Sequence, residues 1–135
     1  MTIPSAEELL GRARAVAPGA YVPYSNFHVG AVVVAEDGRI FDGVNVENSA
    51  YGSTICAEAN AISTAAAAGV RRIDTVAVAC PDADECYPCG NCRQLMREFN
   101  VRRVVVQDPT GGHREHTLAE LLPHAFGPDQ LAGPS

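Results

Sequence analysis

Two short cysteine-containing segments constrain this chain more than any other feature of its sequence. The first places Cys56 two residues before Glu58, and the second places Cys89 three residues before Cys92. Three thiols from two segments can hold a zinc ion. A structural zinc site usually fills its fourth position with a protein ligand, whereas a catalytic site leaves it to water. We therefore expect a catalytic site with one Zn²⁺ per chain, with Glu58 beside the metal.

Both cysteine segments stand at the start of predicted helices, at 56–68 and 90–99. A helix N-terminus presents unpaired N–H groups and a partial positive charge, which lower the pKa of a thiol and stabilise thiolate ligands. Zinc lowers the pKa of a bound water to roughly 7 in favourable sites, so a base can activate that water at neutral pH. We expect Glu58 to take the proton from it.

Composition and charge narrow the class of protein. The 135 residues are 47% apolar and 19% charged, which predicts a single compact domain over residues 1–135. A formal net charge of −6 disfavours a nucleic-acid partner. We expect no membrane span, and Glu7 and Glu8 argue against a signal peptide, so we expect a cytoplasmic protein. Five cysteines, an odd number, favour metal ligation over disulfides in that compartment.

The remaining chain alternates between strand and helix patterns. Ser5 with Glu8, and Thr117 with Glu120, form predicted capping boxes. Asp37-Gly38 predicts a β-hairpin turn, and residues after Pro123 are expected to form an extended tail. The alternation predicts an α/β sandwich with helices over a mixed sheet. The expected strands are 29–34, 39–44, 75–79 and 103–107, and the expected helices are 6–17, 56–68, 90–99 and a short one ending near Leu122.

The two cysteine segments resemble the signature of zinc-dependent nucleobase and nucleoside deaminases, and further motifs extend the similarity over nearly the whole chain. They are Tyr24-Ser25-x-Phe27-x-Val29-Gly30-Ala31, Gly43-x-Asn45-Val46-Glu47-Asn48, Cys56-Ala57-Glu58, Pro88-Cys89-Gly90-x-Cys92-Arg93-Gln94 and Glu120-Leu121-Leu122-Pro123-x-x-Phe126-Gly127. In this order, the motifs resemble those of the small homotetrameric cytidine deaminases.

The resemblance implies a fold and a reaction. The fold is a three-layer α/β/α sandwich with a mixed five-stranded sheet. The reaction is zinc-dependent hydrolytic deamination of cytidine or deoxycytidine to uridine or deoxyuridine plus ammonia, a step of pyrimidine salvage. Cys56, Cys89 and Cys92 hold the zinc in this reading, and Glu58 moves protons between water and the substrate.

The resemblance also implies how the substrate is bound. Phe27 stacks on the pyrimidine, Asn45 and Glu47 bond the ribose hydroxyls, and the backbone of Ala57 contacts the base edge. In the family's homotetramer, neighbouring subunits complete each site. Tyr51 and Phe126 would serve there, and the tail at 123–135 would contact neighbouring subunits.

Two features depart from the family pattern. Many relatives have an arginine at the position of Ala59, where it offsets the charge of three thiolates on one zinc. Zn²⁺ with three thiolates keeps one net negative charge, which raises the pKa of the bound water unless the helix N-termini or Arg93 compensate. Cys80 and Cys86 are additional cysteines, which we interpret as small, partly buried side chains.

Three alternative functions remain open from the sequence. A deaminase of blasticidin-type or other modified cytosine nucleosides shares the zinc motif, but those antibiotics lack the ordinary ribose for which Asn45 and Glu47 are suited. A Cys₄ structural-zinc or iron–sulfur protein could use Cys86, Cys89 and Cys92 together with Cys56 or Cys80, but it leaves Glu58 without a role. A nucleic-acid-editing deaminase is disfavoured by the acidic charge.

Overall fold

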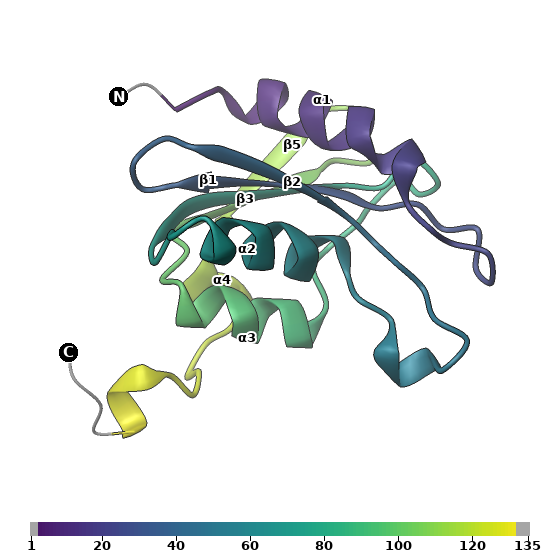
Figure 1. The fold of residues 1–135 in the computed structure, drawn as a ribbon. Helices are drawn as coiled ribbons and strands as arrows, with labels where there is room; N and C mark the ends of the chain where they lie inside the picture. Colours follow the sequence, from purple (N-terminus) through teal and green to yellow (C-terminus); the bar gives the residue numbers. More distant parts are fainter. Residues whose placement is uncertain (1–2, 132–135) are drawn as a thin grey trace.

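The structure, a computed structural model, describes residues 3–131 and contains a five-stranded mixed sheet covered on both faces by helices (Figure 1). The strand order is β2-β1-β3-β4-β5, and all neighbouring pairs are antiparallel except β3 and β4. Helix α1 lies on one face, and α2, α3 and α4 lie on the other (Figure 1). The predicted three-layer sandwich is confirmed. The strands are β1 (Gly30–Ala35), β2 (Ile40–Val44), β3 (Ile73–Ala79), β4 (Arg103–Gln107) and β5 (His113–Thr117).

The helices begin where the sequence predicts. Both capping boxes are present, at Ser5 and at Thr117. Cys56 and Cys89 are the N-cap residues of α2 and α3, so each helix begins one residue after a predicted zinc ligand. The α-helices are α1 (Ala6–Val16), α2 (Ala57–Ala67), α3 (Gly90–Glu98) and α4 (Leu118–Leu121), and the 3₁₀ helices are η1 (Ala17–Gly19), η2 (Tyr51–Ser53) and η3 (Pro128–Leu131).

The central strands are buried on both faces, as their continuous apolar runs require. Along β1, Val33 packs into the core under α2 and α3, while its neighbours Val32 and Val34 pack under α1. One glycine permits close packing of a helix on the sheet. A Cβ at Gly43 would lie 2.4 Å from the carbonyl oxygen of Ala57, so α2 can approach β2 only because this residue has no side chain.

The functional segments gather at one end of the sheet because of the strand register. Gly30, the first residue of β1, pairs with Val44, the last residue of β2, and also with Ala79, the last residue of β3. The loops that precede β1, follow β2 and follow β3 therefore leave the sheet side by side. The N-termini of α2 and α3 lie at the same end (Figure 1).

Two features of the C-terminal part differ from the sequence pattern. The sequence pattern predicts four strands, whereas the family resemblance implies five. The fifth is β5. The pattern does not reveal it because its residues are mostly polar and exposed at a sheet edge. The tail, predicted to be extended, contains η3, and its last residues, 132–135, lie outside the described part of the chain. No helix within residues 3–131 has the length and apolarity to cross a membrane.

Candidate zinc centre and active site

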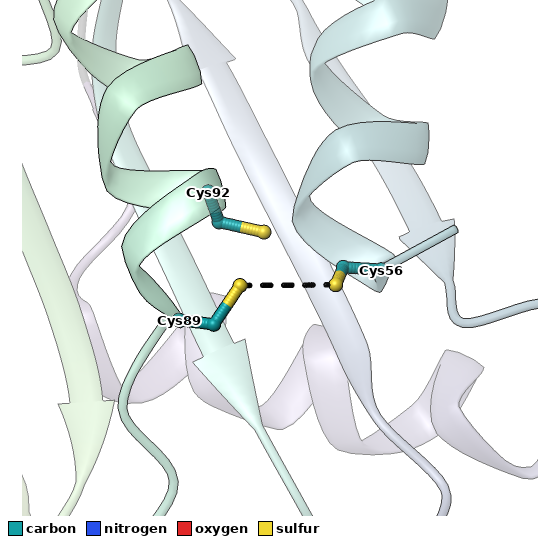
Figure 2. Close-up of side chains that lie close together, drawn as sticks. All are labelled: Cys56, Cys89 and Cys92. Carbon is teal, nitrogen blue, oxygen red and sulfur yellow. Dashed lines mark hydrogen bonds between the residues drawn. The ribbon is translucent and has the colours of Figure 1, made fainter. Parts of the chain in front are cut away.

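The three predicted zinc ligands converge between the starts of α2 and α3. Figure 2 shows Cys89 and Cys92 on α3 turned towards Cys56 at the start of α2. The sulfur atoms lie within 4.8 Å of one another, and those of Cys56 and Cys89 are 4.0 Å apart. Four-coordinate zinc with Zn–S bonds of about 2.3 Å places its sulfur ligands roughly 3.8 Å apart. The donor set therefore fits a tetrahedral zinc ion with one position left open.

The electrostatics of the sulfur cluster also favour a cation. The pKa of Cys56 is lowered to about 6, chiefly by a hydrogen bond from Cys92, while burial opposes the shift. The pKa of Cys92 is raised, first by the same hydrogen bond and then by burial. When Cys56 is a thiolate, its negative charge therefore opposes the loss of a proton from the neighbouring thiols. A divalent cation removes this conflict because it stabilises all three thiolates.

Glu58 is the buried acid of the site. It follows Cys56 in the first turn of α2 and is only 5% exposed. Its pKa is raised to about 7, mainly by burial and further by the negative charge of Cys56. A carboxyl that titrates near neutrality can both accept and release a proton, as a general acid–base residue must.

Two of the predicted substrate residues, Asn45 and Glu47, lie on a segment that is bonded to the start of α2. The backbone of Val46 exchanges two hydrogen bonds of 2.9 Å with Ile55, the residue before Cys56. Asn60, on α2, also donates from Nδ2 to the carbonyl of Val44 at 2.6 Å. These contacts hold the end of β2, with Asn45 and Glu47, against the start of α2.

Asn45 and Glu47 also shape the loop that carries Phe27. Asn45 accepts from the backbone N–H of Val29 and donates to the carbonyl of Phe27, each at 2.9 Å. Glu47 accepts from the backbone N–H groups of Tyr24 and Ser25, and the Ser25 hydroxyl donates to its second oxygen. Both side chains thus fix the loop that carries Phe27.

Tyr51 and Phe126 lie on separate exposed segments. Tyr51, in η2, is 76% exposed and shares a hollow of about 380 Å³ with Tyr24, Ser25 and Glu47. Phe126 is 56% exposed on the tail, and its carbonyl accepts from Gln94 of α3 at 2.8 Å. The tail leaves α4 at the end of the molecule opposite to η2 (Figure 1).

Sequence reasoning gave no role to several residues that support the site. Ser25 links Glu47 to the Phe27 loop, because its hydroxyl also accepts from the Phe27 N–H at 3.0 Å. Asp82 accepts from both the backbone N–H and Nδ1 of His28, at 2.7 and 2.9 Å, and so joins that loop to the one before Cys89. Ser25 lies within the motif at 24–31, but nothing in the sequence pairs His28 with Asp82.

Cys80 and Cys86 remain outside the metal group. Among residues 3–131, the group with metal-ligand distances consists of Cys56, Cys89 and Cys92 alone. Cys80 is buried and Cys86 is half-buried, as the interpretation of small side chains predicts. This arrangement gives no support to a Cys₄ site.

Comparison with known proteins identifies the family of this site. Residues 4–108 match the family model of the cytidine and deoxycytidylate deaminase zinc-binding region. The chain belongs to this family. As a member of the deaminase family it is a zinc-dependent hydrolase, and its cysteine triad is the group able to hold the metal.

Individual deaminases are similar over almost the full length of the chain. The cytidine deaminase of Sporosarcina psychrophila is 42% identical over 93% of this chain and 94% of its own. That of Mycobacterium tuberculosis is 42% identical over 91% of this chain and 90% of its own. The crystal structure of cytidine deaminase from Burkholderia pseudomallei superposes with a TM-score of 0.84 at 41% identity, covering 91% of this chain and all (100%) of that chain.

Proposed function

We propose that the protein catalyses zinc-dependent hydrolytic deamination of cytidine and deoxycytidine, releasing ammonia. The observation that carries this proposal is the buried carboxyl of Glu58, which lies in the first turn of α2 and interacts with Cys56 and Cys92 of the converging sulfur group. The similarity to proteins named cytidine deaminases over more than nine-tenths of the chain supports the same substrate class.

In this proposal Cys56, Cys89 and Cys92 hold the zinc ion. When bound, zinc supplies the Lewis acidity that makes a water molecule nucleophilic near neutral pH. Glu58 accepts the proton that this water loses and passes it to the ring nitrogen of cytosine. Protonation of the ring makes the amino-bearing carbon electrophilic. Glu58 then takes the remaining proton from the added hydroxyl and delivers it to the amino group, which leaves as ammonia.

Phe27, Asn45, Glu47 and the backbone of Ala57 bind the nucleoside in this proposal. A carboxylate has about four lone-pair positions, and three of those on Glu47 are taken by Tyr24 and Ser25, so one remains for a ribose hydroxyl. After donating to Phe27, the Asn45 amide has a second N–H with no partner among residues 3–131. Each polar side chain therefore has one hydrogen bond available for the sugar.

A homotetramer completes the proposed site. Tyr51 and Phe126 are large and exposed in a single chain, as expected for residues that lie against a neighbouring subunit. The tail at 123–135 would carry Phe126 to that neighbour. Light scattering of the purified protein tests the assembly, and a monomer with full activity would contradict it. No nucleic-acid or membrane partner is part of this proposal, and the expected location is the cytoplasm.

The substrate is tested with a panel of cytosine nucleosides. Zinc-loaded protein should release ammonia from cytidine and deoxycytidine in a spectrophotometric assay. Turnover of blasticidin alone would replace the proposed substrate with the alternative one.

The role of Glu58 is tested with Glu58→Gln. The variant should keep its zinc and its fold but lose activity by roughly 10²–10⁴-fold, the usual contribution of a general acid–base residue. A zinc-loaded Glu58→Gln protein with the wild-type rate would refute the proton-transfer role.

A further inference from the structure

The segment just before Cys89 is tied to β5 and α4, which lie beyond the 4–108 region matched by the family model. Two separate links make this connection, one through Tyr87 and one through Arg93. Pro88, the residue between Tyr87 and Cys89, is buried. Because Cys89 is the N-cap residue of α3, its backbone is extended (φ −69°, ψ 167°) and lies outside the regular helix. Its position therefore depends on how the preceding residues are held.

The first link is a hydrogen bond from the loop to β5. The hydroxyl of Tyr87 lies 3.1 Å from Nε2 of His116, and the two rings have centroids 5.5 Å apart. Nδ1 of His116 faces the carboxylate of Glu120 at 3.7 Å. The carboxylate favours a proton on Nδ1, which leaves Nε2 as the acceptor. Tyr87 is thus the donor, and its ring also packs against the core under α2 and α3.

Glu120 is itself fixed. Its other carboxylate oxygen accepts from the backbone N–H and the hydroxyl of Thr117, each at 3.0 Å, in the capping box of α4. His116 lies on β5 opposite Val104 of the central strand β4. Tyr87 therefore bonds to a ring held from two sides.

The second link is made by Arg93 of α3. Its Nε donates to the carbonyl of Pro88 at 2.8 Å, and its Nη1 donates to the carbonyl of Leu121 at 2.7 Å. One guanidinium thus joins the residue before Cys89 to the end of α4. With this geometry Arg93 is engaged by two backbone carbonyls next to the metal site.

We propose that Tyr87, through its hydrogen bond to His116, is a positioning residue for the zinc ligand Cys89, so that β5 and α4 hold one side of the metal centre. This inference rests on the zinc site of the proposed function. Tyr87 does not touch the metal in this role. It reduces the number of loop conformations that the free protein samples, and so lowers the entropy lost when Cys89 takes up its place as a ligand. Mutation of residues that orient a metal ligand without touching the metal typically lowers metal affinity by roughly 10- to 100-fold.

The test is the rate at which zinc leaves the folded protein to a chromophoric chelator, measured for Tyr87→Phe, His116→Ala and the double variant. Tyr87→Phe keeps the ring in the core and removes only the hydroxyl. We expect zinc release to be roughly tenfold faster in each single variant. The double variant should be no faster than Tyr87→Phe alone, because Tyr87→Phe already removes the bond to His116, together with the contact of the same hydroxyl with Arg114. His116→Gln, which retains a side-chain acceptor, should restore part of the slow release.

Tyr21→Phe is the matched control, since the Tyr21 side chain is 58% exposed on another loop. It should release zinc at the wild-type rate. The visible spectrum of the cobalt-substituted protein gives a second readout, because its thiolate-dependent bands report the geometry at Cys89. These bands should change in Tyr87→Phe and not in Tyr21→Phe.

The outcomes separate this inference from the proposed function. If Cys89→Ser loses zinc while Tyr87→Phe keeps the wild-type release rate and cobalt spectrum, the zinc site stands and the positioning role is overturned. Additive effects in the double variant also overturn it, because the two residues would then act independently. If Cys89→Ser binds zinc as the wild type does, the proposed site itself fails.

Discussion

The buried carboxyl of Glu58 should make the stability of the metal-free protein depend on pH in a way that Glu58→Gln removes. The folded protein raises the pKa of Glu58 to about 7, chiefly through burial. A raised pKa means that the folded state binds the proton more tightly than the unfolded state. The stabilising contribution is therefore complete below the unfolded pKa of 4.5 and is lost as pH rises through about 7.

The size of the effect follows from the shift. From 4.5 to about 7 is about 2.5 pKa units, and each unit corresponds to about 1.4 kcal/mol. The side chain is 5% exposed, so solvent screens this little. We expect wild-type, metal-free protein to lose roughly 3 kcal/mol of this contribution between pH 4.5 and pH 7.

Urea unfolding in chelator and reductant, at a series of pH values across this window, measures the effect. The quantity of interest is the free energy of unfolding of the wild type minus that of Glu58→Gln. This difference should fall as pH rises. Cys56, whose pKa is lowered to about 6, has the opposite sign, since its contribution is lost as pH falls through that value. It is present in both proteins and largely cancels. A difference that stays constant with pH would refute the assignment of the raised pKa to Glu58.

Three further predictions follow from the packing and the site. Gly43→Ala should lower the free energy of unfolding by roughly 1–3 kcal/mol, because its Cβ would lie 2.4 Å from both the Ala57 carbonyl oxygen and the Ala61 nitrogen. Gly11→Ala, with no atom within 4 Å of the added Cβ, should instead gain roughly 0.5–1 kcal/mol in α1, and equal losses in both variants would contradict this packing. Asn45→Asp should raise the KM for cytidine roughly tenfold, because a carboxylate oxygen would replace the Nδ2 group that now donates to the Phe27 carbonyl, so that two acceptors would face each other. An unchanged KM in the same deamination assay would show that this contact does not shape the site. Chelation should lower the Tm of the wild type by roughly 5 °C or more, with recovery on adding zinc, whereas Cys89→Ser should show no such shift in differential scanning fluorimetry.

Local patterns predicted most of the fold because they act over a few residues. The Ser5 and Thr117 capping boxes, the Asp37-Gly38 turn and the starts of α2 and α3 are set by neighbours within one turn of chain. The hydrophobic pattern does not predict β5, because its side chains are mostly polar and lie on an exposed sheet edge. Backbone pairing with β4, and not apolar burial, holds this strand in place.

The dual use of Asn45 and Glu47 was also invisible in the sequence. The motif indicated that both residues serve a ligand. Their bonds to the loop around Phe27 join segments about twenty residues apart, and no local propensity encodes such a pairing.

The sequence alone determined the chemistry of the site. Thiols and a carboxylate at fixed short spacing can hold zinc and move a proton, and placing them at helix starts needs only local backbone preferences. The tertiary structure decided which distant groups support that chemistry. The pairing of Gly30 with Val44 and Ala79 brings three loops together, burial raises the pKa of Glu58, and β5 brings His116 to Tyr87. Such contacts depend on the packing of the whole sheet, because that packing fixes both the distance between remote residues and the exclusion of water around them.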